Sequence, residues 1–124
     1  MALADLVLAP DALAPSRARE ALAEALADKA SVEWLSRAQL ALSEVVSNAV
    51  RHGGAGPLQL VIDGTTTLVT VRVVQVGPPP ERPSIVNMPH PWSTSGYGLA
   101  IIDSIADRWG VQLEPPSVWF ELEL

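Results

Sequence analysis

Four polar residues recur along one side of an otherwise apolar stretch, "ALSEVVSNAVRHGG", residues 41–54. They are an acid, an amide, an arginine and a histidine: Glu44, Asn48, Arg51 and His52. At about 100° per residue in a helix, all four fall within an arc of roughly 100°, opposite a group of apolar side chains. The pattern is compatible with the solvated face of an amphipathic helix. Asparagine, however, is a poor residue for a helix interior, and this weakens the interpretation as a plain solvated face. Whether the stripe is a site depends on what the rest of the chain brings to it.

A second candidate site lies in "STSGYGLAIIDSIADRWG", residues 93–110, where a glycine-punctuated loop leads directly into a predicted helix. The free N–H groups at the start of a helix, together with the positive end of its dipole, attract anions. Gly96 and Gly98 would let the backbone approach a phosphate closely. A G-x-G pattern alone is weak, since two glycines can simply end a loop.

The elements that must position these residues follow from hydrophobic periodicity. Helical spacing predicts helices over residues 15–28, over the opening stretch after an N-cap at Ser31, and from Gly98 to a C-terminal stop at Gly110. Alternation and β-branched runs predict strands over residues 3–9, 58–63 and 68–76, and a closing hairpin over residues 110–124. A long proline-rich loop lies between the third strand and the third helix. This order predicts an α+β fold, a two-layer sandwich.

Composition limits the classes of protein that fit. With 124 residues, of which 48% are hydrophobic, we expect one domain over residues 1–124. A net charge of -6 argues against a nucleic-acid partner, because phosphate neutralisation needs a cationic surface. The absence of cysteine excludes disulfides and suits a cytoplasmic protein. We also expect no signal peptide and no membrane association, because no apolar run approaches the ~20 residues of a membrane helix.

In combination and in order, these blocks resemble the GHKL (Bergerat-fold) histidine kinase-like ATPases, above all the small bacterial anti-sigma-factor serine/threonine kinases. The family block "SE-V-NAVRH" is similar to "SEVVSNAVRHG", and "GxGL-ID--AD-WG" is similar to "SGYGLAIIDSIADRWG". The closing "SVWFEL" looks like the family's final strand, with Ser117 where a threonine is common, so that the resemblance implies a cofactor-binding role for Ser117. The resemblance covers residues 15–124. It implies a mixed, mainly antiparallel sheet with helices on one face.

The resemblance also implies ATP and Mg²⁺ as cofactors, and it implies roles for the polar stripe. Asn48 would offer its side-chain oxygen to Mg²⁺. Glu44 would be the catalytic base and accept a proton from water or from a partner's serine. Arg51 and His52 would lie near phosphate or brace Glu44. The phosphates would be cradled, below an ATP lid, by Gly96, Gly98 and the amide of Leu99.

The family's adenine-binding block, D-x-G-x-G, is where this chain departs from the pattern. The chain reads "QVGPP", so that Gln75 replaces the aspartate, Gly77 is kept, and Pro79 replaces the second glycine. Glutamine can accept a hydrogen bond from the adenine amine and donate one to a ring nitrogen. Pro79 has no N–H and a fixed φ. These two changes leave both ATP and Mg²⁺ binding open.

Two functions are therefore expected as alternatives. The first is an ATP-binding regulatory protein that phosphorylates or sequesters a protein partner, such as a sigma factor or an anti-sigma antagonist, in transcription regulation. The second is a degenerate Bergerat-fold interaction module that no longer binds nucleotide. The sequence does not decide between a serine/threonine kinase and an inert binder, and a homodimer is compatible with either. A Ser–His–acid hydrolase finds no support, because His52 and His90 are the only histidines and no Gly-x-Ser-x-Gly turn is present.

Overall fold

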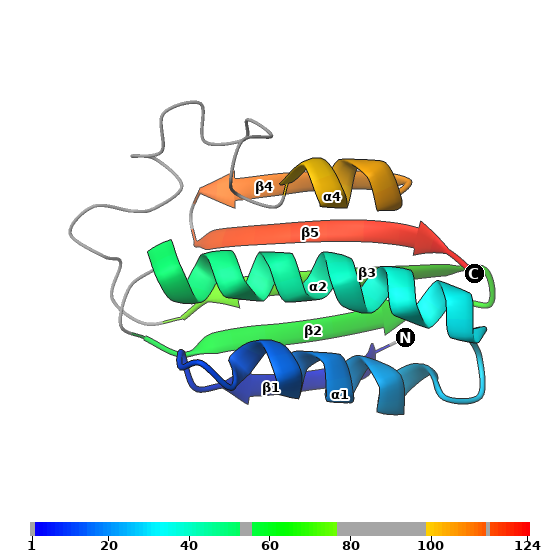
Figure 1. Cartoon of the computed structure of the whole chain (residues 1–124), viewed down its shortest axis with the longest axis horizontal. Coiled ribbons are helices and arrows are strands. Elements are labelled where there is room, and N and C mark those ends of the chain that lie inside the picture. Colours follow the sequence, from blue (N-terminus) through cyan, green and yellow to red (C-terminus); the bar gives the residue numbers. More distant parts are fainter. Residues whose placement is uncertain (1, 53–55, 77–98, 114) are drawn as a thin grey trace.

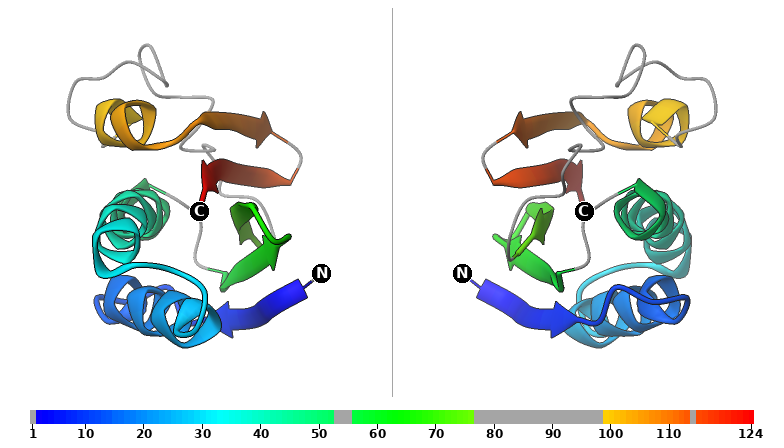
Figure 2. Two further views of the ribbon diagram at one scale, coloured as in Figure 1. Left: turned by 90° about the vertical axis from the view of Figure 1, so that its right-hand side faces the viewer. Right: turned by 90° about the vertical axis from the view of Figure 1, so that its left-hand side faces the viewer.

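The computed structural model describes residues 2–52, 56–76, 99–113 and 115–124. The described chain forms, in order, β1 (Ala2–Leu8), α1 (Ala14–Leu26), α2 (Val32–His52), β2 (Leu58–Gly64), β3 (Leu68–Gln75), α4 (Leu99–Ile105), β4 (Arg108–Leu113) and β5 (Pro116–Glu123). The helices form one layer and the strands form a second layer behind them (Figures 1 and 2). The predicted two-layer α+β fold is confirmed.

The sheet has the strand order β1-β2-β3-β5-β4, so that β3 is central and β1 and β4 lie at the edges. All four pairings among the described strands are antiparallel, as the resemblance implies for most of the sheet, and no parallel pair occurs among them. The register places Val71 between Ile62 on β2 and Phe120 on β5. These three buried side chains share the face of the sheet that the helices cover.

The core lies between the helical layer and this face of the sheet. Strand alternation places Leu58, Leu60 and Ile62 inward, and all three are buried. α2 begins at its predicted cap, since the Ser31 hydroxyl accepts a hydrogen bond from the Trp34 amide at 3.1 Å. α2 is amphipathic. None of the helices in the described ranges has the length and apolar character needed to cross a bilayer.

The third helix is shorter than predicted, and Gly110 is not its stop. α4 ends at Ile105, and residues 108–113 instead form the edge strand β4. Pairing with β5 outweighs the local helical pattern here, and the Arg108 guanidinium forms an ion pair with Glu121 at 2.9 Å. Gly110 lies opposite Trp119, where a Cβ atom would come within 2.8 Å of the indole ring. The glycine is thus explained by close packing between two strands.

Candidate functional site

The polar stripe of α2 lies where the sequence predicts it. Glu44 and Asn48 are partly exposed, one helical turn apart, and Arg51 is exposed in the last turn of the helix. The opposite face packs on the core through a row of buried apolar side chains, which includes Leu42, Val45, Val46 and Ala49. This apolar face fixes the rotation of α2 about its axis. The stripe is consequently held on the side of the helix that faces away from the core.

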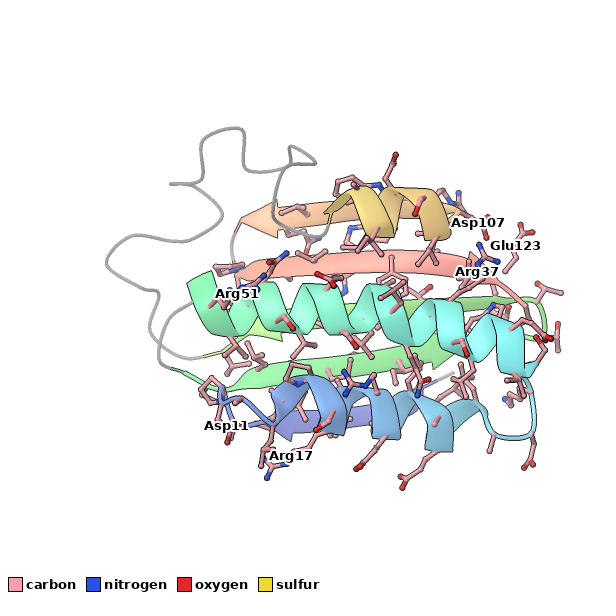
Figure 3. The ribbon with its side chains drawn as sticks, viewed as in Figure 1. Asp11, Arg17, Arg37, Arg51, Asp107 and Glu123 are labelled. Atoms are coloured by element: carbon pink, nitrogen blue, oxygen red, sulfur yellow. The ribbon has the colours of Figure 1, made fainter. Side chains whose placement is uncertain are left out.

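Asn48 and Arg51 contact each other directly. The Arg51 Nη2 atom donates a hydrogen bond to Asn48 Oδ1 at 2.8 Å. The two residues are three positions apart in the helix, a spacing that brings side chains together on one face. A guanidinium is therefore held beside the amide oxygen at the C-terminal end of α2 (Figure 3). An amide oxygen is also a hard oxygen donor, the kind of ligand that Mg²⁺ takes.

Gln75 is the last residue of β3 and lies at the same end of the molecule as the C-terminal end of α2 (Figure 1). It pairs with the buried Leu58, so its side chain emerges on the helix-covered face of the sheet. Its Oε1 atom is buried and has no hydrogen-bond partner among the described residues. An unsatisfied buried acceptor costs about 1–3 kcal/mol. Such an atom in a native fold calls for an explanation, and a ligand N–H group is one that fits.

Ser117 does not join these residues. It pairs with Val74 on β3 and with Gln112 on β4, so it lies on the face of the sheet opposite Gln75. Its hydroxyl is within 3.3 Å of Gln112 Oε1, which also accepts a hydrogen bond from Arg72 Nη1 at 2.9 Å. The structure thus places this buried serine in a polar cluster on the outer face, away from the stripe on α2.

Several predicted site residues fall outside the described part of the chain. These are Gly77, Gly96 and Gly98, together with Pro79, and the same holds for the side chains of His52 and Leu99. The backbone of Leu99 opens α4, as predicted.

Arg37, on α2, makes a contact that no sequence motif predicts. Its Nη2 atom donates a hydrogen bond to the carbonyl oxygen of Ile105 at 3.3 Å and so ties the end of α4 to α2. Ile102, on the inner side of α4, is fully buried. These two contacts hold α4 against the helical layer, with the Arg37 bond at the end of α4. No local sequence pattern predicts this hydrogen bond, because Arg37 and Ile105 are 68 residues apart in the chain.

A shallow hollow of about 660 Å³ lies elsewhere, beside the β2–β3 turn and the C-terminus, lined by Lys29, Gly64, Thr65, Thr66 and Leu124. It contains none of the predicted site residues. The β2–β3 turn is at the opposite end of these strands from Gln75. The stripe on α2 and the end of β3 are therefore the stronger candidate.

The fold and this polar end define a class: a two-layer α+β domain in which a helix end and the end of the central strand form the candidate site. The profile of the histidine kinase-like ATPase domain matches residues 7–118. The chain therefore belongs to the histidine kinase-like ATPase domain family. A search of curated proteins found no match to the chain. Family membership supports an ATP-binding, regulatory function.

Proposed function

We propose that this protein binds Mg-ATP at the end formed by α2 and β3 and uses it to regulate a protein partner, by phosphorylation or by sequestration. The observation that carries the proposal is the buried Oε1 atom of Gln75, which has no hydrogen-bond partner among the described residues. Gln75 ends β3, and this end of β3 lies at the same end of the molecule as the C-terminal end of α2 (Figure 1). The family of the chain supplies the class of ligand, since its members are ATPase-like domains.

Gln75 would contact the base. In this proposal its Oε1 atom accepts a hydrogen bond from the exocyclic amine of adenine, and its Nε2 group donates one to a ring nitrogen. The first of these bonds gives the buried acceptor the partner that it lacks among the described residues. The residue thereby takes the position of the aspartate in the D-x-G-x-G block, without its charge.

Asn48 and Arg51 would contact the phosphates. Asn48 Oδ1, to which the Arg51 guanidinium donates a hydrogen bond, would be the protein's oxygen ligand to Mg²⁺. No group of three or more His, Cys, Asp or Glu that could hold a metal occurs in the described ranges. The ion would accordingly take most of its ligands from phosphate oxygens and water, as is common for Mg²⁺. The Arg51 guanidinium, Gly96, Gly98 and the Leu99 amide would face the phosphates.

Glu44 would be the base. Its carboxylate makes no hydrogen bond or ion pair within the described part of the chain, so it is available to accept a proton. It lies one turn from Asn48 on the same face of α2 and is therefore near the phosphate that Asn48 helps to position. In this proposal it orients an attacking hydroxyl from a partner's serine, or from water, and takes up its proton.

The partner in this proposal is a sigma factor or an anti-sigma antagonist in the cytoplasm. The order of the motifs, which is similar to that of anti-sigma-factor kinases, supports this part. If phosphate from γ-labelled ATP does not reach a serine of the cognate antagonist, the kinase part is wrong. Glu44→Gln should abolish transfer while keeping ATP affinity, whereas Glu20→Gln, at an exposed position on α1, should change neither.

The test of the site itself is calorimetric titration with ATP and ADP, with and without Mg²⁺. We expect micromolar binding that depends on Mg²⁺. We also expect Asn48→Ala to weaken Mg-ATP by about 5- to 150-fold, the range for loss of one partner in a polar site. Absence of heat up to millimolar nucleotide would contradict the proposal. In that case the degenerate interaction module becomes the better interpretation. If the Gln75→Asp variant then binds ATP although the wild type does not, the rest of the pocket is intact.

A further inference from the structure

The chemistry of Gln75 differs from that of a carboxylate in a way that affects which base the site accepts. An ionised carboxylate only accepts hydrogen bonds, whereas a carboxamide offers one accepting oxygen and one donating NH₂ group. The Gln75 carboxamide therefore presents a hydrogen-bond acceptor and a hydrogen-bond donor side by side at the end of β3, on the helix-covered face of the sheet. It can therefore pair with more than one pattern of donors and acceptors.

Purines with an amino group at position 6 and purines with an oxygen there present opposite patterns of hydrogen-bond donors and acceptors along the edge formed by position 6 and N1. A 6-aminopurine, such as adenine, has a donor at its exocyclic amine and an acceptor at ring nitrogen N1. A 6-oxopurine, such as guanine or hypoxanthine, has an acceptor at O6 and a donor at N1–H. The carboxamide pairs with the first pattern through Oε1 and Nε2, and with the second after the two atoms exchange places. A carboxylate can accept a hydrogen bond from the amine of a 6-aminopurine. Against a 6-oxopurine it places an acceptor next to O6, which is also an acceptor, and this contact is repulsive.

The surroundings of Gln75 leave this exchange open. The Oε1 atom has no hydrogen-bond partner among the described residues, so no hydrogen bond from them holds the oxygen at the buried end of the amide. The terminal torsion of a glutamine side chain is broad and roughly two-fold, so a half-turn is sterically ordinary. Pairing with Leu58 holds the backbone in the sheet, so that the amide keeps its place while its two ends exchange.

We propose that Gln75 makes the site accept 6-oxopurine nucleoside triphosphates as well as ATP. The inference rests on the nucleotide site proposed above. In this inference Gln75 determines which base the site binds, whereas the residues of α2 contact the phosphates. The adenine preference that an aspartate enforces would thus be relaxed in this protein.

Competition calorimetry with ATP and inosine triphosphate, both with Mg²⁺, tests this directly. Inosine triphosphate isolates the edge, because it carries O6 and N1–H without the 2-amino group of guanine. We expect the two dissociation constants of the full chain to agree within about tenfold. In Gln75→Asp we expect inosine triphosphate to weaken by about 5- to 150-fold relative to ATP, since one donor is lost and two acceptors face each other. The control Gln112→Asp makes the same change on the opposite face of the sheet and should leave the ratio unchanged.

The outcomes are distinguishable. If ATP binds and inosine triphosphate is weaker by much more than tenfold, the base inference is wrong while the nucleotide site stands. If Gln75→Asp leaves the ratio of the two affinities unchanged, Gln75 does not read the base and the inference is also wrong. If neither nucleotide binds, the proposed site is refuted, and this inference with it. Circular dichroism of each variant confirms that it is folded.

Discussion

Replacing Gln75 by methionine should stabilise the free protein while weakening its nucleotide binding. Methionine is unbranched and similar in length, so it can follow the path of the glutamine side chain with little repacking. It removes the Oε1 atom, which is buried without a partner among the described residues. Removing a polar group seldom stabilises a protein. It is expected to do so where the group serves ligand binding at a cost to the stability of the free protein.

The size of the effect follows from the burial of this atom. An unsatisfied buried acceptor costs about 1–3 kcal/mol, and the lower part of that range applies because the rest of the Gln75 side chain is partly exposed. We therefore expect the free energy of unfolding to rise by about 1–2 kcal/mol. For 124 residues at about 2.1 cal/mol/K each, the unfolding entropy is about 0.26 kcal/mol/K. The melting temperature should rise by about 4–8 °C.

Urea unfolding followed by circular dichroism measures this change, with and without Mg-ATP. The control is Gln112→Met, because Gln112 is exposed and its Oε1 atom already accepts a hydrogen bond from Arg72. This control should be neutral or slightly destabilising. ATP at 100 times its dissociation constant should stabilise the wild type by about 2.7 kcal/mol, and Gln75→Met much less. A Gln75→Met midpoint at or below that of the control would refute the reasoning, since the oxygen would then have a partner in the native state.

Two further substitutions test the packing of the sheet and of α2 by urea unfolding. Gly110→Ala should cost about 1–3 kcal/mol, because the new Cβ atom would meet the Trp119 ring at 2.8 Å, whereas Gly64→Ala should cost less, because it meets the end of a flexible leucine side chain. Equal costs for the two glycines would contradict the proposed strand contact. Trp34→Phe should also cost about 1–3 kcal/mol, because the Glu123 carbonyl loses the indole N–H that donates to it at 2.7 Å. An unchanged midpoint would show that water replaces this bond without loss.

Much of the fold could be predicted because its signals are local. The Ser31 cap, the alternation of Leu58, Leu60 and Ile62, and the apolar face of α2 each depend on residues a few positions apart. The polar stripe was found by the same helical periodicity. Its position on the side of α2 away from the core follows directly from the burial of the opposite side.

Other features depend on the pairing of distant strands, which no local sequence pattern predicts. Gly110 resembles a helix stop in sequence, but the pairing of β4 with β5 makes it the neighbour of an indole ring. Ser117 matches a family position by sequence, yet the β3–β5 register turns it away from Gln75. A shift of one residue in register moves a side chain to the other face, and register is not encoded in either strand alone. The burial of Gln75 Oε1 without a hydrogen-bond partner among the described residues likewise depends on the three-dimensional fold.

The order of the strands has a kinetic consequence. β2 and β3 are joined by a short turn, as are β4 and β5, so each hairpin can close through local contacts. The β3–β5 pairing instead joins strands separated by all of residues 76–115. The entropy of closing that loop is lost before its contacts form, which places this pairing late in folding. Because each doubling of loop length adds only about 0.6 kcal/mol, the connection from β3 to α4 can change in length at little cost to the stability of the sheet.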